Sequence, residues 1–310
     1  MRGVKVNFSK QAVVASIKDG LLSFPVTDFD ADGKFDADSY RRRLLWLKEY
    51  EVSALFVAGG TGEFFNMTIE EYREIVTIAV ETIGGHVPII ASAGQSAELA
   101  KAHCEAAREA GADGILLMPP YLTECPQSGI VEYAASVCES TDLSVIYYNR
   151  ANGYLNVDGV QALADRCPNL VGLKDGKGDM QALNIIIKTL GDRLAYVGGV
   201  PTAEIIAEAY LAIGVSTYSS AVFNFVPEMA VKFYRELRQG NRDFVRQATR
   251  EFFIPFVTLR DTQKGYAVSL IKAGADLVGY PGGNVRAPLT MPSEQERATL
   301  KQLIEKARTL

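Results

Sequence analysis

The stretch LVGLKDGKGD, residues 170–179, places Lys174 directly after an apolar run that is typical of a buried strand. Lysine is among the residues least often buried, because its ammonium group loses hydration inside a protein. In a structural interpretation, Lys174 reaches a rim and pairs with Asp175. In a chemical interpretation, the desolvated lysine loses its proton more easily and acts as an amine nucleophile. Lys177 is interpreted as a solvated loop charge.

Histidine and cysteine offer little competing chemistry. Neither His86 nor His103 is paired with another histidine or with a carboxylate at metal-ligand spacing. The four cysteines are scattered without a CxxC pair, which indicates reduced thiols rather than a disulfide framework. We therefore expect no metal site, no histidine-based triad and no cofactor.

The composition argues against two classes of partner. The 310 residues are 48% hydrophobic and 22% charged, as in ordinary globular proteins. A net charge of −5 and a pI near 5.3 provide no basic surface for nucleic acid. No apolar run approaches the roughly 18 residues that cross a bilayer, and the N-terminus lacks a convincing signal-peptide cleavage site. We expect no nucleic acid and no membrane as partners, and a cytoplasmic location.

Eight short apolar runs alternate with segments of helical periodicity. This alternation is typical of parallel βα units, and runs that are apolar on both faces fit strands covered on both sides. Eight such units close a (β/α)8 TIM barrel, which is the fold we predict. An open doubly wound sheet is the alternative, but no GxGxxG follows the first run. The runs are LLSFPVT from 21, ALFVAG from 54, PIIASAG from 88, GILLMPP from 114, SVIYYN from 144, LVGLKD from 170, AYVGGV from 195 and VSTYSS from 215.

Helix signals accompany these runs. TIEE at 68–71 and SEQE at 293–296 have the form of capping boxes, and REAGADG ends its helix on glycine. We expect residues 1–240 to form the barrel with a short N-terminal helical lead-in. Residues 241–310 should form a C-terminal helical extension that packs on the barrel.

Function in such a barrel lies at the C-terminal ends of the strands. The ends predicted here carry PVTDFD, GGTGE, PPYLT, YYNR, Lys174, GGVPT and YSSAVFN. One lysine, tyrosines, hydroxyls, glycine-rich turns and an arginine suit imine chemistry on an anionic substrate. Periodicity alone does not choose between Tyr147 and Tyr148. Ser219 and Ser220 either face the pocket or satisfy the strand end, and Glu63 is expected to brace its turn.

At these strand ends the chain resembles the dihydrodipicolinate synthase and N-acetylneuraminate lyase superfamily of class I aldolases. The similarity covers roughly residues 20 to 300 and rests on GGTGE (59–63), YN (148–149), GLKDGKGD (172–179) and GG (198–199). Within the superfamily the closest resemblance is to the 5-dehydro-4-deoxyglucarate dehydratases. It rests on segments such as YNRAN, GGVPTAE, YSSAVFNFVPE and GYAVSLIKAGADLVG.

The resemblance implies roles for individual residues. Lys174 matches the lysine that forms the Schiff base, Tyr148 the tyrosine that moves protons at the imine, and Thr61 the turn residue that holds the keto-acid end of the substrate. The backbone N–H groups of Gly60 and Thr61 would form an anion-holding turn. Gly199, in the GG pair, is expected among the substrate-binding residues together with the two serines of the eighth strand end, Ser219 and Ser220.

The chain departs from the synthase branch at three positions. Gly60 replaces a second hydroxyl residue, and Leu122 stands where the synthases carry a tyrosine that reaches a neighbouring subunit. Arg150 follows the YN pair in place of proline, and arginine binds carboxylates through two hydrogen bonds. We therefore expect Arg150 to bind the second carboxylate of a sugar diacid. Family resemblance also implies a homotetramer.

The resemblance, together with these strand-end residues, implies a cofactor-free decarboxylating dehydratase that converts 5-dehydro-4-deoxyglucarate to 2,5-dioxopentanoate, water and carbon dioxide through an imine at Lys174. One alternative is a class I retro-aldolase that uses the same lysine to cleave a 2-keto-3-deoxy sugar acid to pyruvate. Another is a non-catalytic barrel that only binds sugar acids.

Overall fold

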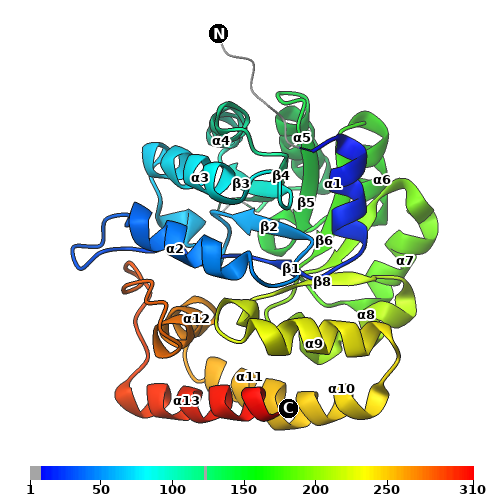
Figure 1. Ribbon diagram of the computed structural model, residues 1–310. Coiled ribbons are helices and arrows are strands. Elements are labelled where there is room, and N and C mark those ends of the chain that lie inside the picture. The colour runs from blue at the N-terminus through cyan, green and yellow to red at the C-terminus, as the bar shows by residue number, and fades with distance from the viewer. Residues whose placement is uncertain (1–7, 122–123) are drawn as a thin grey trace.

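The computed structural model describes residues 8–121 and 124–310, and its centre is a closed barrel of parallel strands (Figure 1). Each strand pairs with the next in sequence, and β1 closes the barrel by pairing with β8. The predicted (β/α)8 TIM barrel is confirmed. The strands are β1 (Leu22–Ser23), β2 (Ala54–Val57), β3 (Ile89–Gln95), β4 (Gly114–Pro120), β5 (Ser144–Asn149), β6 (Leu170–Asp175), β7 (Ala195–Gly198) and β8 (Thr217–Ser220).

Helices surround the barrel, and the predicted signals at the start of α3 and the end of α4 form as expected. Thr68 forms a capping box with Glu71 at the start of α3, and α4 ends at Gly111 with a φ of +87°. The helices of the barrel are α1 (Lys10–Lys18), α2 (Ala37–Leu47), α3 (Ile69–Ile83), α4 (Ala97–Ala110), α5 (Gln127–Cys138), α6 (Val157–Arg166), α7 (Met180–Leu190), α8 (Ala207–Ile213) and α9 (Pro227–Arg238).

The interior of the barrel holds its own apolar cluster. Val13 and Ile17 of α1 are fully buried and join this cluster, so the N-terminal helix fills the end of the barrel where the strands begin. Burial of such a side chain contributes about 1.5–3 kcal/mol to folding. Phe24 and Tyr148 form the part of the same cluster that lies nearest the opposite end, where the strands finish. The barrel is thus closed by packing at one end and open for chemistry at the other.

After α9 the chain forms a further helical layer on one side of the barrel (Figure 1). A π-helix, η6 (Thr249–Phe253), joins the first two of these helices, and residues 278–293, the connecting segment, join the last two. This segment runs along the barrel, where the carbonyl of Gly282 accepts a hydrogen bond from the N–H of Phe29 at 3.0 Å. The helices are α10 (Arg242–Ala248), α11 (Ile254–Arg260), α12 (Tyr266–Leu277) and α13 (Glu294–Thr309).

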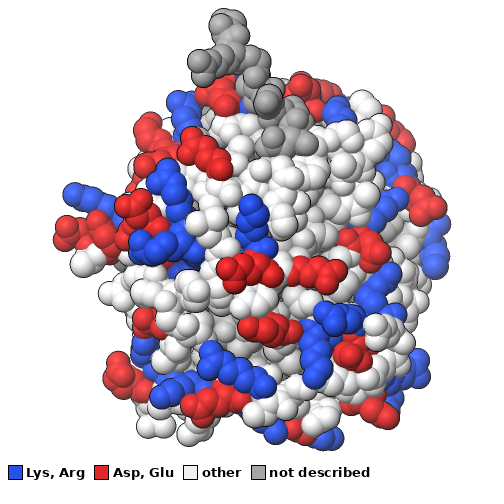
Figure 2. Space-filling view, in the orientation of Figure 1, with Lys and Arg blue, Asp and Glu red and all other residues white. Residues whose placement is uncertain are grey.

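Acidic and basic side chains are interspersed over the face shown in Figure 2, and they do not gather there into a patch of one sign. Such a surface lacks the basic stripe that binds a phosphate backbone. Across the described ranges, none of the helices combines the length and the apolar character required to traverse a bilayer.

Candidate active site

A cavity of about 560 Å³ lies at the C-terminal ends of the strands. Loops after the strands form one part of its wall. Helices α11 and α12 and the connecting segment form another part through Phe256, Val268 and Leu289. The predicted site residues that line the cavity are Gly60, Thr61, Tyr148, Arg150, Lys174, Gly199 and Ser219.

Lys174 is 3% exposed, and its amine points into this cavity rather than to an exposed rim. Its Nζ donates to the carbonyl of Gly199 at 3.1 Å and lies 3.7 Å from the centre of the Tyr148 ring. Burial lowers the pKa of Lys174 and outweighs the opposing effect of Tyr148, and the nearby Arg150 guanidinium also lowers it. A lowered pKa raises the fraction of neutral amine near neutral pH, which is the form that attacks a carbonyl.

Asp175 does not provide the salt bridge of the structural interpretation. Its carboxylate accepts hydrogen bonds from the Tyr210 hydroxyl at 2.6 Å and from the N–H of Gly178 at 3.0 Å. Over residues 8–121 and 124–310, no carboxylate forms an ion pair with Lys174. The amine is therefore buried without a carboxylate in contact with it.

Tyr148 lies beside the lysine and shares its acceptor. The phenol donates to the carbonyl of Gly199 at 2.8 Å, and Nη1 of Arg150 donates to the phenol oxygen at 3.3 Å. Burial acts to raise the pKa of Tyr148, but the positive charges of Lys174 and Arg150 outweigh burial and lower it. A phenol with a lowered pKa next to an amine is suited to proton transfer at the adjacent carbon.

The strand pleat decides between the two adjacent tyrosines. Tyr147 points outward from the barrel, where its hydroxyl donates to the carbonyl of Gly153 in the 3-10 turn after β5. Burial raises its pKa. Tyr148 points inward to the cavity, as successive side chains of a strand must alternate.

The turn after β2 presents backbone donors to the cavity. In the described part of the chain, the N–H groups of Gly60 and Thr61 donate to no protein acceptor, although both residues line the cavity. A Cβ atom on Gly60 would meet nothing within 4 Å, so the glycine leaves open space there instead of serving a backbone requirement. N–H groups without a protein acceptor at a cavity wall are available to bind an anion.

Two arginines line the cavity, and sequence reasoning found only one. Arg150 is exposed, and among the described residues its only hydrogen bond is the one to the Tyr148 phenol. Arg260, from α11, donates to the carbonyl of Pro201 at 2.9 Å and to the hydroxyl of Thr202 at 2.8 Å. Its position in the C-terminal helices gives no signal in the sequence that it reaches the barrel mouth. Gln95 was also missed, but its place at the end of β3 could have revealed it.

The two serines of β8 point to opposite sides. Ser219 lines the cavity, whereas Ser220 is fully buried outside it and its hydroxyl donates to Glu204 at 2.6 Å. Ser220 therefore bonds to a buried carboxylate at the strand end and, contrary to the prediction, does not line the cavity. Burial raises the pKa of Glu204 to about 7.

Two other expectations concern Leu122 and a metal site. Leu122, which the sequence comparison singled out, lies outside the described residues. Within the ranges 8–121 and 124–310, no group of three or more histidines, cysteines and carboxylates could hold a metal ion.

A model of the dihydrodipicolinate synthetase family matches residues 18–307. The chain belongs to this family. It is 50% identical to the 5-dehydro-4-deoxyglucarate dehydratase of Pseudomonas putida over 298 residues, which cover 96% of this chain and 98% of that protein. It is also 50% identical over 288 residues to a probable 5-dehydro-4-deoxyglucarate dehydratase of Acinetobacter baumannii (strain AB307-0294), covering 93% and 95% of the two chains. The superfamily predicted from the strand ends is confirmed.

The fold of the family is also found in solved structures. The crystal structure of dihydrodipicolinate synthase from Oceanobacillus iheyensis superimposes with a TM-score of 0.87 and covers 96% of this chain and 100% of that chain. The two sequences are 24% identical, so this similarity bears on the fold alone.

Proposed function

We propose that this chain is a decarboxylating dehydratase that converts 5-dehydro-4-deoxy-D-glucarate to 2,5-dioxopentanoate, water and carbon dioxide. The name of its relatives at 50% identity supports the substrate and the reaction. The observation that carries the mechanism is the buried amine of Lys174, without an ion-pair partner in the described residues and in contact with Tyr148 and Gly199.

The first half of the reaction needs an amine and a base. Lys174 attacks the ketone next to one carboxylate, water leaves, and a protonated imine forms that accepts electrons. Tyr148 removes a proton from the neighbouring CH2 group, which gives an enamine. The enamine expels the β-hydroxyl as water and leaves a conjugated iminium ion. Throughout, the N–H groups of Gly60 and Thr61 hold the keto-acid carboxylate, and the Thr61 side chain contacts the same end.

The second half uses the same electron acceptor. The distal carboxylate leaves as carbon dioxide, and the electrons of its carbon–carbon bond flow through the conjugated system to the iminium nitrogen. Protonation on carbon and hydrolysis then release the product and free Lys174. Arg150, whose guanidinium carbon lies 5.7 Å from the centre of the Tyr148 ring, binds the distal carboxylate before it leaves. Ser219 and the Gly199 carbonyl complete the substrate contacts that we propose.

Trapping tests this function directly. The protein is incubated with 5-dehydro-4-deoxyglucarate and reduced with borohydride; the adduct is mapped by mass spectrometry and carbon dioxide is measured. We expect an adduct on Lys174 and stoichiometric carbon dioxide. Lys174→Ala should lose both, whereas Lys177→Ala should keep both, because the Lys177 side chain is 50% exposed and pairs with Asp179.

Two other results would overturn the proposal. An adduct on Lys174 with free pyruvate and no carbon dioxide would assign aldol cleavage. Tight binding without any adduct would assign a sugar-acid-binding barrel.

We also propose a homotetramer in the cytoplasm. Family membership supports the tetramer, and sedimentation equilibrium of the purified protein tests it. Four free cysteines, three of them buried, support a reducing compartment. The division into a barrel, residues 1–240, and an extension, residues 241–310, falls between α9 and α10, and limited proteolysis tests whether the two parts separate.

A further inference from the structure

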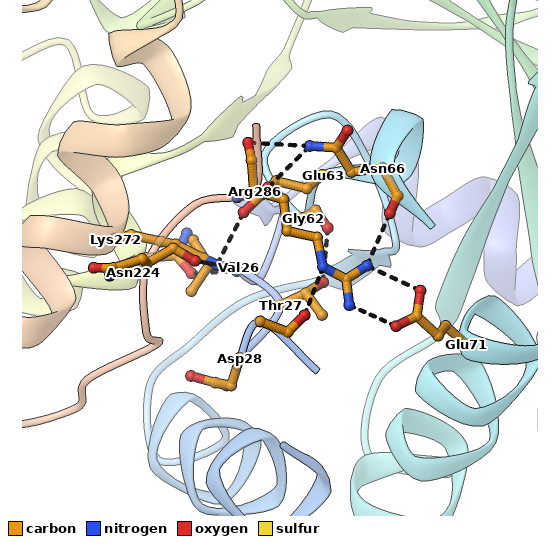
Figure 3. Close-up of polar contacts among 12 residues, drawn as sticks. Val26, Thr27, Asp28, Gly62, Glu63, Asn66, Glu71, Asn224, Lys272 and Arg286 are labelled. Atoms are coloured by element: carbon orange, nitrogen blue, oxygen red, sulfur yellow. Dashed lines mark hydrogen bonds and ion pairs between the residues drawn. The ribbon is translucent and has the colours of Figure 1, made fainter. Parts of the chain in front are cut away.

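A buried ion pair lies directly behind the Gly60–Thr61 turn. Glu63 ends the GGTGE motif, and its carboxylate lies 2.9 Å from Nζ of Lys272 in α12. Both side chains are 0% exposed. Figure 3 draws their ion pair. The proposed reaction uses neither of them, yet a pair of fully buried charges is costly to desolvate.

Glu63 is fixed to the turn through its backbone and to other segments through its side chain. Its N–H donates to the carbonyl of Gly60 at 3.1 Å, and its φ of +62° is a left-handed conformation that is rare outside glycine. One carboxylate oxygen accepts the backbone N–H of Arg286 at 2.9 Å and the side-chain amide of Asn66 at 3.3 Å (Figure 3). Glu63 is therefore held within its own turn, by the connecting segment through Arg286 and by α12 through Lys272.

Lys272 is the counter-ion of the Glu63 carboxylate. The other charged groups that pack around this pair have partners of their own: Arg43 pairs with Asp28 at 2.6 Å, and Arg286 binds Glu71 at 2.5 Å. Lys272 also donates to the carbonyl of Asn284 in the connecting segment at 3.1 Å. Without Lys272, a buried negative charge would stand two residues from Thr61 and three from Gly60, whose N–H groups we propose bind the anion.

Stability alone does not account for this pair. Replacing a buried ion pair by neutral side chains of similar volume is often neutral or stabilising. The pair does, however, join the turn to α12, the helix that also supplies the cavity wall through Val268 and Ile271. It thus connects the donors for one end of a substrate to the wall around the rest of it.

We propose that Glu63 and Lys272 are positioning residues for the keto-acid carboxylate of the substrate: their ion pair holds the Gly60–Thr61 turn against α12, and Lys272 cancels the charge that would repel the anion. This inference rests on the proposed function, because it assumes that the turn binds that carboxylate. It assigns part of the substrate site to the C-terminal helices.

The test uses pyruvate and methyl pyruvate as probes of the turn. Both can form an imine with Lys174, but only pyruvate carries the carboxylate, and neither has the distal one. Apparent affinities come from the concentration dependence of borohydride trapping. Lys272→Met should weaken the binding of pyruvate roughly ten- to a hundred-fold, as expected when a buried cation near an anion site is lost, and the binding of methyl pyruvate much less. A purely structural defect would weaken both probes equally.

A double variant keeps the test decisive if Lys272→Met does not fold. Glu63→Gln/Lys272→Met removes both charges, should fold, and should still bind pyruvate more weakly than the wild type because the link to α12 is gone. The matched control, Asp28→Asn/Arg43→Met, removes the neighbouring buried pair and should keep the pyruvate affinity. Wild-type affinity in the first double variant, or an unchanged preference for pyruvate over its ester in Lys272→Met, would overturn the inference. A wild type that forms no adduct with either probe would overturn the proposed function, and this inference with it.

Discussion

Gly199 sets how closely Lys174 can approach its neighbours, and Gly199→Ala tests that geometry. A Cβ atom at this position would lie 2.4 Å from Nζ and 2.5 Å from Cγ of Lys174, and 2.6 Å from the backbone carbonyl of Asp175. Ordinary contacts begin at 3.4 Å, so the amine must move by about 1 Å. A displacement of that size lowers kcat/KM by about a hundred-fold, and overpacking destabilises the fold by about 1–3 kcal/mol.

The measurement combines steady-state kinetics with thermal unfolding and the rate of borohydride trapping. Gly129→Ala serves as the control, because a Cβ atom there meets its nearest neighbour at an ordinary 3.5 Å, away from the cavity. It should keep full activity. If Gly199→Ala retained wild-type kcat/KM and wild-type stability, the close packing of Gly199 against Lys174 would be wrong, and with it the shared acceptor that holds the amine next to Tyr148.

Three further predictions concern the charges around the cavity. Arg150→Met removes a cation that lowers the pKa of Lys174, so the low-pH limb of the pH profile of kcat/KM should move to higher pH. Arg260→Met removes a cation from the same cavity and should leave that limb in place. The pKa of Glu204 is about 7 in the folded chain, against an ordinary value of 4.5, so the folded state binds more protons than the unfolded state and stability falls as the pH rises between these values. Glu204→Gln should flatten this pH dependence and raise the free energy of unfolding above pH 7 by up to about 3 kcal/mol. Chemical denaturation at a series of pH values measures both effects. Ser220→Ala removes the donor to that buried carboxylate and should cost about 1–3 kcal/mol of stability with KM unchanged; a raised KM would show that the serine contacts substrate.

The barrel could be predicted because each βα unit carries its own local signals. A run such as SVIYYN is apolar on both faces, and in the structure β5 occupies those same residues, 144–149. The capping box that begins at Ser293 forms as its spacing implies, with Glu296 bonded back to the cap. Such signals depend on residues within one turn of each other, so the surrounding fold does not need to be known.

The residues at the strand ends could be found for the same reason, but the directions of their side chains were harder to predict. Tyr147 and Tyr148 are adjacent, and only the pleat of β5 shows which one faces the cavity. Ser219 and Ser220 present the same problem at the end of β8, where the second serine serves Glu204 instead of the cavity. A shift of one residue reverses the side on which a side chain lies, and apolar runs without alternation carry no information on that shift.

The contribution of the C-terminal helices could not be predicted, because it depends on how a distant segment folds back. Arg260 and Leu289 reach the cavity from α11 and from the connecting segment, which has no regular secondary structure to reveal its path. Lys272 is separated from Glu63 by more than half of the chain, and within α12 it has the sequence context of an ordinary helical lysine. Its complete burial follows only from the packing of that helix against the barrel mouth. A barrel that ended at residue 240 would therefore keep the lysine that attacks the substrate and lose both a wall of the cavity and the counter-ion behind the anion-binding turn.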